Sequence, residues 1–401
     1  MVRALTLVCV LLALSVTVAA VAADWPCFMG PDRSGISSET GLNKNWAVKA
    51  PAVLWQVPMS DKGYAGPSVA DGKVFIVDHA GAQDIVRALD LETGKEVWNY
   101  PYQDTAKDNY GYARCTPTVV DGKVYTLGRL GQLICLDAKT GKAVWGKNII
   151  NDFGGQHPQW DYAGSVLIDG EKAVVCTGSA NGSVAALNKD TGETIWTGGN
   201  ADAAGYSTPV PATILGQKQY VVFTAGSVVG VNADSGKLLW SFPWTTKYNV
   251  NAPQPVIEGN FIFVTSGYGS GCALYEITAQ GPQQRWANKL ISSHFNSPIF
   301  YNGYIYSGSD PGNLVCMSPQ TGQVAWTQGG FEKGGLIIAD GTIIMLGGNS
   351  GDLVMAKAAA DSYQELGRIK PLGGQSWTAP ILANGRLLVR NKETLACLDL
   401  R

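Results

Sequence analysis

Short apolar runs separated by polar turns fill most of the chain. Between residues 66 and 100, runs rich in β-forming residues include Lys73–Asp78 and Ile85–Asp90. Asp71-Gly72, a dipeptide that favours a two-residue hairpin, precedes the first of these runs. Branched and aromatic residues in runs of this length favour strands over helices. The pattern predicts four short antiparallel strands joined by tight turns.

The same unit recurs along the chain, and its most regular motif is Thr-Gly-Lys followed three residues later by Trp. Successive anchor positions lie 40 to 51 residues apart. A repeat of this period indicates a solenoid, a propeller or an array. The anchors of the eight copies are Trp55, Trp98, Trp145, Trp196, Trp240, Trp286, Trp326 and, where the tryptophan is replaced, Leu366.

The last copy is divided between the two ends of the repeat region. Asn384-Gly385 and Ala396–Asp399 belong to its first strands, and Ala52–Val57 supplies the missing fourth strand. Pairing of the first and last segments would close a ring and remove its free sheet edges. We therefore predict an all-β, eight-bladed β-propeller of four-stranded antiparallel blades over residues 50–401.

The recurring tryptophan is expected to dock one blade onto the next. Its large apolar face needs a packing partner and its N–H needs an acceptor, while the turn glycine allows close approach. The alternative is that Trp and Gly are merely suitable strand and turn residues. The fifth copy lacks Thr-Gly-Lys, so we expect this docking to be weakened at Trp286 and lost at Leu366.

Residues 1–23 have the pattern of a secretory signal peptide, with Arg3 ahead of an apolar run that ends in small residues. A membrane anchor is the alternative, but the strongly apolar part ends near Val18, and a spanning helix needs about 20 apolar residues. Residues 24–49 are then a leader that we expect to pack on the propeller. No later stretch is apolar enough to cross a bilayer.

The net charge limits the kinds of partner that the protein can bind, and the cysteine content bears on its disulfide bonds. The net charge of −2 gives no basic surface of the kind that nucleic acids or anionic membranes attract. Seven cysteines follow the signal peptide, and an odd number argues against a complete disulfide framework. Cys135, Cys316 and Cys397 recur at matching repeat positions, which indicates small buried apolar residues.

The segment Ala88–Trp98 resembles the tryptophan-docking motif of the pyrroloquinoline-quinone (PQQ) repeat family, and the likeness covers nearly all of residues 50–401. This family includes large PQQ-dependent dehydrogenases and smaller proteins without cofactor, among them the BamB-type component of the outer-membrane β-barrel assembly machinery. Asp24–Gly35 resembles the entry segment of exported PQQ-like propellers of planctomycete-type bacteria.

The resemblance implies what an enzyme of this family would need. Its dehydrogenases hold PQQ against a disulfide between adjacent cysteines, with a calcium ion on carboxylate and amide ligands and an Asp as base. No two cysteines are adjacent here, and most carboxylates lie in repeat turns, where turn capping explains them. We therefore expect no cofactor, no metal and no catalytic residue. A PQQ- and calcium-dependent alcohol or sugar dehydrogenase is the alternative.

Candidate binding residues follow from position. Residues just before each first strand, together with those on two longer connections, are expected to ring one mouth of the central channel. Aromatic and polar groups converging on a concavity typically form a binding site, although ordinary interblade contacts would look the same. The candidates are Tyr64, Arg114, His157, Trp160, Tyr162, Tyr206, Asn251, His294, Asn296, Lys333 and Trp377.

These expectations converge on an exported, non-catalytic binding or scaffold protein of the periplasm or cell envelope. Its partner would be an envelope protein or a glycan bound at the channel mouth, with no role for nucleic acid. It would act as a monomer or as a subunit of a larger assembly.

Overall fold

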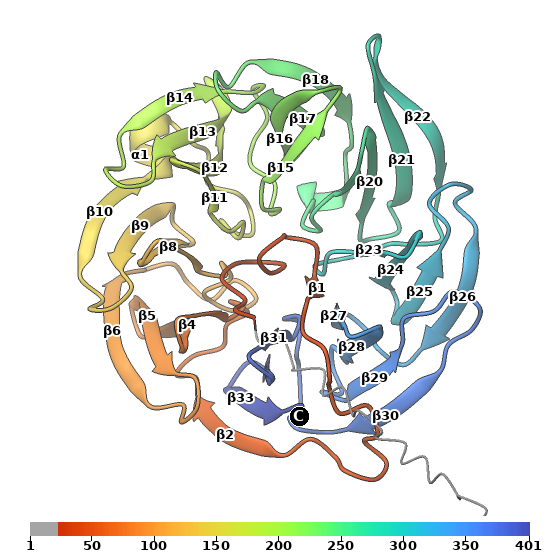
Figure 1. Ribbon diagram of the computed structural model, residues 1–401. Helices are drawn as coiled ribbons and strands as arrows, with labels where there is room; N and C mark the ends of the chain where they lie inside the picture. The colour runs from red at the N-terminus through yellow and green to blue at the C-terminus, as the bar shows by residue number, and fades with distance from the viewer. Residues whose placement is uncertain (1–22) are drawn as a thin grey trace, which may run out of the picture.

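Eight blades form a closed ring around a central axis in the computed structural model, which describes residues 23–401 (Figure 1). Each blade is an antiparallel sheet whose first strand lies nearest the axis and whose fourth lies at the rim. The predicted all-β, eight-bladed propeller is therefore confirmed. The predicted signal peptide lies outside the described residues, apart from Ala23.

Blades 1 to 4 each use four consecutive strands. Blade 1 consists of β3 (Ser68–Ala70), β4 (Lys73–Ala80), β5 (Gln83–Asp90) and β6 (Glu96–Gln103). Blade 2 consists of β7 (Thr118–Val120), β8 (Lys123–Leu127), β9 (Gln132–Asp137) and β10 (Ala143–Asn148). Blade 3 consists of β11 (Leu167–Asp169), β12 (Lys172–Ser179), β13 (Gly182–Asn188) and β14 (Thr194–Gly198). Blade 4 consists of β15 (Val210–Ile214), β16 (Gln217–Phe223), β17 (Ser227–Asn232) and β18 (Leu238–Pro243).

The second half of the ring follows the same plan until the last blade. Blade 5 consists of β19 (Val256–Glu258), β20 (Phe261–Ser266), β21 (Gly271–Thr278) and β22 (Gly281–Asn288). Blade 6 consists of β23 (Ile299–Tyr301), β24 (Tyr304–Ser309), β25 (Asn313–Met317) and β26 (Val324–Gly329). Blade 7 consists of β27 (Gly335–Ala339), β28 (Thr342–Leu346), β29 (Leu353–Lys357) and β30 (Glu365–Ile369). Blade 8 consists of β31 (Ile381–Ala383), β32 (Arg386–Arg390), β33 (Thr394–Asp399) and β2 (Val53–Pro58).

Blade 8 closes the ring as predicted. Its fourth strand, β2, comes from the start of the repeat region and pairs antiparallel with β33, so that Trp55 lies opposite Cys397. Figure 1 shows β2 and β33 side by side at the rim, next to the C-terminus. The join hydrogen-bonds the edge strand that each end of the repeat region would otherwise leave free.

Two short helical segments lie in the connections between blades, where the strand pattern predicted none. The helix α1 (Ile149–Phe153) begins at Asn148, whose side chain accepts hydrogen bonds from two main-chain N–H groups of the first turn. It ends at Gly154, which has a left-handed backbone with φ of 69°. A 3₁₀ turn covers Lys247–Asn249. Helix capping by Asn and Gly is a local signal that the strand pattern does not carry.

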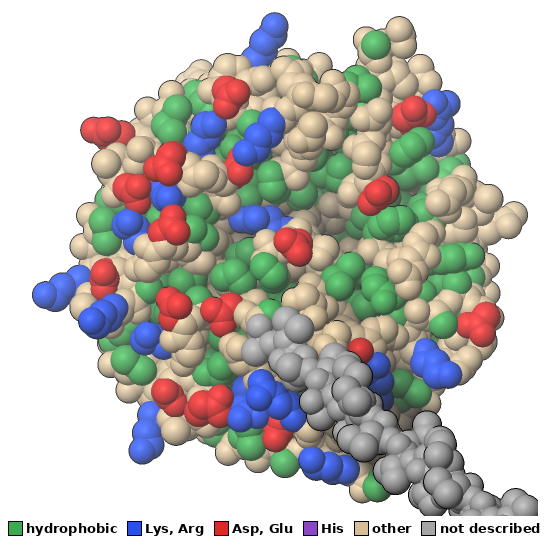
Figure 2. Space-filling view, in the orientation of Figure 1, with side chains coloured by type: hydrophobic (Ala, Val, Ile, Leu, Met, Phe, Trp, Pro, Cys, Tyr) green, Lys and Arg blue, Asp and Glu red, His purple; other side chains and the backbone are tan. Residues whose placement is uncertain are grey.

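The leader, residues 24–49, crosses the middle of the ring on one face (Figure 1). Its strand β1 (Ile36–Ser37) pairs in parallel with β27 of blade 7. Figure 2 shows the same face, where side chains fill the centre of the ring instead of an open hole. Leader contacts reach the first strands of blades 1, 2, 3, 6 and 7, the turn after the first strand of blade 8, and the connection just before blade 5. They join Trp25 with Val69, Pro26 with Val119, Arg33 with Ile168 and with Gln254, Gly35 with Ile299, Ile36 with Ile338, and Asp24 with Asn384.

Six of the seven anchor tryptophans contact the following blade. Each indole N–H donates to a main-chain oxygen there, at 2.8 to 3.3 Å. Where that blade carries the Thr-Gly-Lys turn or its close variants, the turn glycine lies flat against the indole. A Cβ on Gly141, for example, would stand 2.6 Å from Trp98. The six are Trp55, Trp98, Trp145, Trp196, Trp286 and Trp326.

Trp240 departs from this arrangement, and the expected weak point lies there and not at Trp286. Its indole N–H donates to the Gln219 side chain of its own blade at 2.6 Å. The docking turn is supplied by the following blade, and in blade 5 the two-residue turn Ala279-Gln280 replaces the glycine turn between β21 and β22. Blade 7 also lacks the glycine, but its turn still presents the main-chain oxygen of Ala359 to Trp326. Blades 4 and 5 are joined by another contact, in which Phe242 stacks on Tyr275 with ring centroids 3.8 Å apart.

The junction between blades 7 and 8 uses the leader. Leu366 occupies the anchor position and packs only partly buried against the core. Trp46 of the leader, 4% exposed, lies directly over Gly367, where an added Cβ would meet it at 2.4 Å. A tryptophan from outside the repeat thus covers the position at which the repeat has lost its own.

All seven cysteines in the described part of the chain are buried and unpaired. Burial was predicted from the repeat positions of three of them, Cys135, Cys316 and Cys397. Among residues 23–401, no helix has the length and hydropathy that a bilayer crossing requires.

Candidate binding pocket

A pocket of about 550 Å³ lies on the ring axis, with Phe28 of the leader in its lining. First strands begin at the pocket and end at the leader. In blade 7, for example, Gly335 at the start of β27 lies near Asn296 of the pocket wall. Further along the strand, Ile338 pairs with the leader. The leader therefore closes one end of the channel, and the pocket is reached from the face opposite to that in Figure 2.

Seven of the eleven candidate residues line this pocket. They come from seven connections between blades, and ring closure brings them together although they are spread over more than three hundred residues. They are Tyr64, Arg114, Trp160, Tyr206, Asn296, Lys333 and Trp377.

The other four candidates lie outside the lining. Tyr162 is buried, and its hydroxyl donates to two main-chain oxygens. Asn251 is fully buried, and its side-chain amide donates to three main-chain oxygens. The side chain of His157 is 39% exposed and pairs with Asp161 at 3.3 Å. His294 lies behind the wall, with Nδ1 3.2 Å from a carboxylate oxygen of Asp310. Tyr162 and Asn251 therefore brace the connections.

Eight aromatic rings follow one another around the pocket, and we call them the aromatic collar. Neighbouring ring centroids lie 4.0 to 6.4 Å apart, mostly in edge-on or tilted arrangements. Such contacts are favourable because the positive edge of one ring meets the negative face of the next. In order, the collar consists of Tyr110, Trp160, Tyr248, Tyr268, His294, Phe295, Trp377 and Tyr64.

Three collar tyrosines, Tyr110, Tyr248 and Tyr268, were missed by positional reasoning because they do not immediately precede a strand. All three have a left-handed backbone, with φ of 64°, 66° and 58°. Bulky residues rarely adopt this conformation, and its occurrence at a pocket commonly marks a functional constraint. A detectable signal was present in the sequence, because Tyr110 and Tyr268 each adjoin glycine in a turn.

The stacked pair Tyr64 and Trp377 is held from both sides. Their rings lie 5.2 Å apart and 13° from parallel. The Asn296 side-chain amide donates to the main-chain oxygens of Lys333 and Trp377, at 3.0 and 3.2 Å. The buried guanidinium of Arg390 donates to the main-chain oxygens on either side of Tyr64. Burial raises the pKa of the Tyr64 hydroxyl to about 12, so it remains protonated at neutral pH.

The polar lining is cationic or neutral. The ammonium of Lys333 lies 5.2 Å from the ring centroid of Phe295 and 5.1 Å from that of Trp377. Arg114 is largely neutralised by Asp161 at 3.2 Å. None of the lining side chains in the described part of the chain is a carboxylate. The neutral polar members are Asn109, Thr116, Gln159, Ser165, Thr208, Asn296 and Thr378.

A buried charge network supports the wall that carries Tyr110 and Trp160. The guanidinium of Arg129 is 1% exposed and donates to both oxygens of Asp104, at 2.9 and 3.1 Å. It also donates to Asp161 at 3.1 Å, which ties the two long connections together. Buried charges are tolerated when they are paired and fully hydrogen-bonded in this way.

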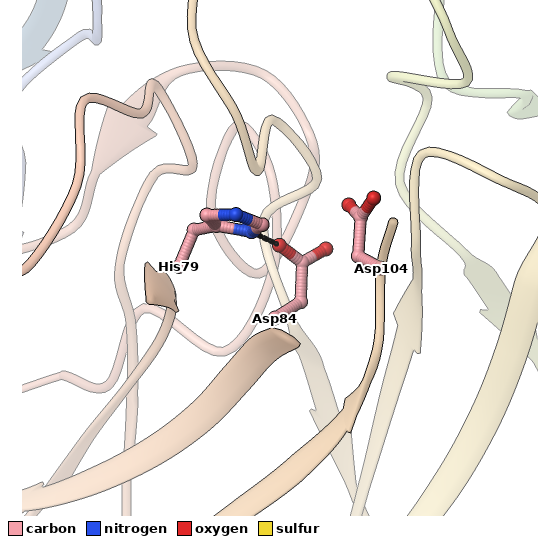
Figure 3. A group of neighbouring side chains, drawn as sticks. All are labelled: His79, Asp84 and Asp104. Atoms are coloured by element: carbon pink, nitrogen blue, oxygen red, sulfur yellow. Dashed lines mark hydrogen bonds and ion pairs between the residues drawn. The ribbon is translucent and has the colours of Figure 1, made fainter. Parts of the chain in front are cut away.

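His79, Asp84 and Asp104 come together behind this network, with ligand atoms within 4.8 Å of one another (Figure 3). Nδ1 of His79 lies 2.8 Å from Asp84, and Nε2 lies 3.0 Å from the main-chain oxygen of Gly81. Burial, and secondly the charge of Asp104, raise the pKa of Asp84 to about 6. Arg129 already donates to both oxygens of Asp104, so a cation bound here would compete with that guanidinium.

Three buried N–H or ring-nitrogen atoms of the collar have no hydrogen-bond partner among the described residues. They are Nε1 of Trp160, Nε1 of Trp377 and Nε2 of His294. Buried polar atoms of side chains are nearly always satisfied by protein or by ordered water. Their concentration around one pocket agrees with a place where water or a ligand completes the bonding.

The donor set of the pocket does not fit the calcium-bound quinone of the dehydrogenases. Calcium takes six to eight oxygen ligands, usually with several carboxylates. The described lining offers hydroxyl and amide oxygens but no carboxylate. The cysteines are buried and unpaired, so they also provide no disulfide against which a quinone could lie.

Comparison with known proteins gave matches of two kinds. A family model described as "Outer membrane protein assembly factor BamB" matches residues 45–114 and 82–328, more than half of the chain. The outer membrane protein assembly factor BamB of Shewanella oneidensis is 25% identical over 268 residues, covering 65% of this chain and 62% of that protein. A quinohemoprotein alcohol dehydrogenase of Comamonas testosteroni is 30% identical over 161 residues, covering 37% of this chain and 22% of that protein. The chain spans less than two thirds of the length of either relative.

Solved structures share the fold at low sequence identity. A quinohemoprotein alcohol dehydrogenase from Comamonas testosteroni has a TM-score of 0.70 at 15% identity, covering 96% of this chain and 81% of that one. BamB from Moraxella catarrhalis has a TM-score of 0.63 at 16% identity, covering 88% of this chain and 98% of that one. These likenesses extend to the propeller fold and no further.

Proposed function

The chain belongs to the family of PQQ-like repeat propellers whose model is described as outer membrane protein assembly factor BamB, and from this premise we propose that it is a non-catalytic binding propeller. It works in the periplasm or cell envelope and holds a protein segment or a glycan in the axial pocket. It acts as a monomer or as a subunit of a larger envelope assembly.

One observation carries this proposal: the pocket is walled by aromatic rings and has no carboxylate among its described lining residues. A glycosidase pair or a calcium site would each need carboxylates. Aromatic faces with a few polar groups instead suit the binding of a ligand that leaves unchanged.

The test compares wild-type protein with a Trp377→Ala variant in capture of partners from an envelope extract. Trp377 lies at the centre of the stacked collar segment, so its removal should abolish capture of a pocket ligand. Phe261→Ala, which removes a 40% exposed aromatic side chain from blade 5, is the matched control and should retain capture. Equal capture by all three proteins would reject the pocket as the binding site.

A PQQ-dependent dehydrogenase is the second candidate, because relatives named as quinone or quinohemoprotein alcohol dehydrogenases match part of the chain at about 30% identity. PQQ with calcium should neither raise the melting temperature of the purified protein nor support dye-linked oxidation of alcohols or sugars. Activity in that assay would overturn the binding proposal.

A further inference from the structure

Three lysines lie over rings of the aromatic collar. Lys333 lies over Phe295 and Trp377, at 5.2 and 5.1 Å from the ring centroids. Lys247 lies 4.9 Å from the ring centroid of Tyr248, and Lys392 lies 5.8 Å from that of Tyr64. A cation over an aromatic face is attracted by the electrons of the ring and stays available to a ligand on its other side.

These three lysines have no carboxylate partner in any ion pair found among residues 23–401. On the outer blade surfaces, Lys123 and Lys218 pair with aspartates at 2.7 Å, whereas turn lysines such as Lys142 lie exposed to solvent. Lys333 differs from both groups because it lines the pocket and lies over two aromatic rings.

Of the acids nearest the collar, Asp161 pairs with two arginines, and Asp310, beside His294, lies in a smaller hollow that Lys333 also lines. Within the described lining of the main pocket no carboxylate accompanies the ammonium of Lys333, and a concave site of one sign concentrates ligands of the opposite sign.

The neutral lining of the pocket suits a ligand rich in hydroxyl groups. Seven side chains of Asn, Gln, Ser and Thr face the pocket. Amide side chains offer both a donor and an acceptor, and hydroxyl side chains can play either role. Sugar hydroxyls have the same dual character, and they can also accept from the indole N–H groups of Trp160 and Trp377, which have no partner among the described residues.

The size and closure of the pocket set how much ligand can enter. A volume of about 550 Å³ is that of a site for one drug-sized molecule or for a short part of a polymer. The leader, with Phe28, closes the far end, so a chain cannot thread through the ring. The pocket can therefore take the end of a polysaccharide but not its middle.

We propose that the pocket binds an acidic sugar, a uronate unit at the end of an oligosaccharide, with its carboxylate at the ammonium of Lys333. The sugar ring lies among the aromatic rings of the collar, and its hydroxyls are bonded by the neutral lining. This inference rests on the proposed binding function and deepens it by naming the ligand class. The described lining supplies no pair of carboxylates of the kind that glycoside hydrolysis normally uses, which favours binding of the sugar over its hydrolysis.

Titration calorimetry with tri-galacturonate and with its methyl ester tests the carboxylate directly. The ester keeps the sugar ring and removes the negative charge. We expect tri-galacturonate to bind at least about tenfold more tightly than its ester, with the difference shrinking as salt screens the charge. A glucuronate oligomer is titrated in parallel to cover the other common uronate configuration.

Lys333→Met removes the ammonium and keeps an unbranched apolar side chain between Phe295 and Trp377. It should weaken tri-galacturonate binding by the same factor as esterification and leave ester binding unchanged. Lys142→Met, at an exposed turn on the rim, is the matched control and should bind like wild type. Lys333→Arg keeps the charge and should restore most of the preference for the acid.

Equal affinity for the acid and its ester, or unchanged binding by Lys333→Met, overturns the inference. So does the absence of binding by both uronate oligomers. Tighter binding of a tri-glutamate peptide, lost in Trp377→Ala, overturns the sugar inference and leaves the binding propeller standing. Oxidation of alcohols or sugars supported by PQQ and calcium would overturn the proposed binding function itself. A failure of the sugar inference can therefore be distinguished from a failure of the proposed function.

Discussion

Three tyrosines at the pocket mouth have backbone conformations that tyrosine normally avoids. A left-handed conformation costs an L-residue about 1 to 2 kcal/mol relative to the right-handed one. The three residues lie on three different connections and all line the same pocket. The fold therefore gives up stability to place these rings, which is the pattern expected where selection acts on a site.

Tyr268 tests this cost through a pair of substitutions that both remove the ring. Tyr268→Gly should be about 1 kcal/mol more stable than Tyr268→Ala, because glycine accepts φ of 58° without steric cost. The free energies of unfolding are measured by urea denaturation.

Tyr275 lies in strand β21 and provides the opposite case. There, glycine should be less stable than alanine by about 0.5 to 1 kcal/mol, since glycine weakens regular structure. The same order of stability at both positions would contradict the strain at Tyr268.

Asp84 makes stability depend on pH in an unusual direction. Its pKa is raised to about 6 in the folded protein and is about 3.9 in an unfolded chain, so folding favours the protonated carboxyl. The contribution to stability is fully present below about pH 4 and is lost as pH rises to 6. Relative to Asp84→Asn, wild type should therefore gain stability as pH falls from 6 to 4.

Urea denaturation of both proteins at pH 4, 5, 6 and 7 measures this difference. Asp137→Asn provides the contrast, because the Thr140 hydroxyl and main-chain N–H lower the pKa of Asp137. Its contribution is present above the unfolded pKa and is lost as pH falls below it. A flat difference between wild type and Asp84→Asn would show that the carboxyl is not the group that titrates.

At the scale of elements, the contact that joins two blades has two halves in neighbouring repeats. The tryptophan belongs to one blade and the turn glycine to the next. The sequence pattern predicted both halves but assigned the missing turn of blade 5 to Trp286, in the same repeat. The structure places the consequence one blade earlier, at Trp240, because contacts cross the boundary between repeats.

Alanine substitutions at Gly141 and Gly122 distinguish the packing cost at this contact from the cost of backbone strain. Both belong to blade 2, with φ of 72° and 70°. A Cβ on Gly122 meets nothing within 4 Å, whereas one on Gly141 would stand 2.6 Å from Trp98. Gly122→Ala should cost about 1 to 2 kcal/mol from strain alone. Gly141→Ala should cost about 1 to 3 kcal/mol more through overpacking.

Thermal or urea unfolding of the two variants gives the comparison. Trp98→Leu on its own should destabilise the protein, and adding Gly141→Ala should then cost little more than Gly122→Ala does. Full additivity of the two changes would mean that Gly141 and Trp98 do not act as one contact.

For the whole molecule, the ring could be predicted, but only half of the collar could. Tyr64, Trp160, His294 and Trp377 were candidates from the sequence, and Tyr110, Tyr248, Tyr268 and Phe295 were not. The strands and turns of each blade are determined by residues close together in the sequence, namely the hairpin dipeptides and the apolar runs, so they can be predicted locally. The collar depends on irregular connections that differ from blade to blade. The Tyr64 and Trp377 rings stack only because the ring closes, and Tyr248 projects from a turn with no repeat counterpart. Lys333 was predicted by position, but its unpaired state is a property of its surroundings.

The reactivity of the buried thiols can show whether the leader opens independently of the ring, because Cys27 lies in the leader and the other six described cysteines lie in the propeller. Burial raises the pKa of Cys27, as it does for the ring cysteines Cys115 and Cys176, and a buried protonated thiol reacts slowly. The folded protein should therefore not react with a thiol reagent. Trp25→Ala keeps the main-chain bridge to Val69 but removes a 2% exposed side chain from the core under the leader, so Cys27 alone should become reactive.

Mass spectrometry of the labelled protein counts and locates the modified thiols. One label on Cys27 in the variant, with the other six appearing only in urea, would show that the leader opens independently of the blades. Simultaneous labelling of all seven would mean that the leader and the ring unfold as one unit.

The leader also sets the order in which the molecule can assemble. It is made before any blade, yet its partners include Asn384 and Gly385 of the last blade, and Ile338 of the one before it. Contacts between residues so far apart in the chain slow folding, because the intervening segment must be ordered first. The leader can complete its docking only after every blade has folded. A fully docked leader is therefore found only in molecules in which the ring is complete.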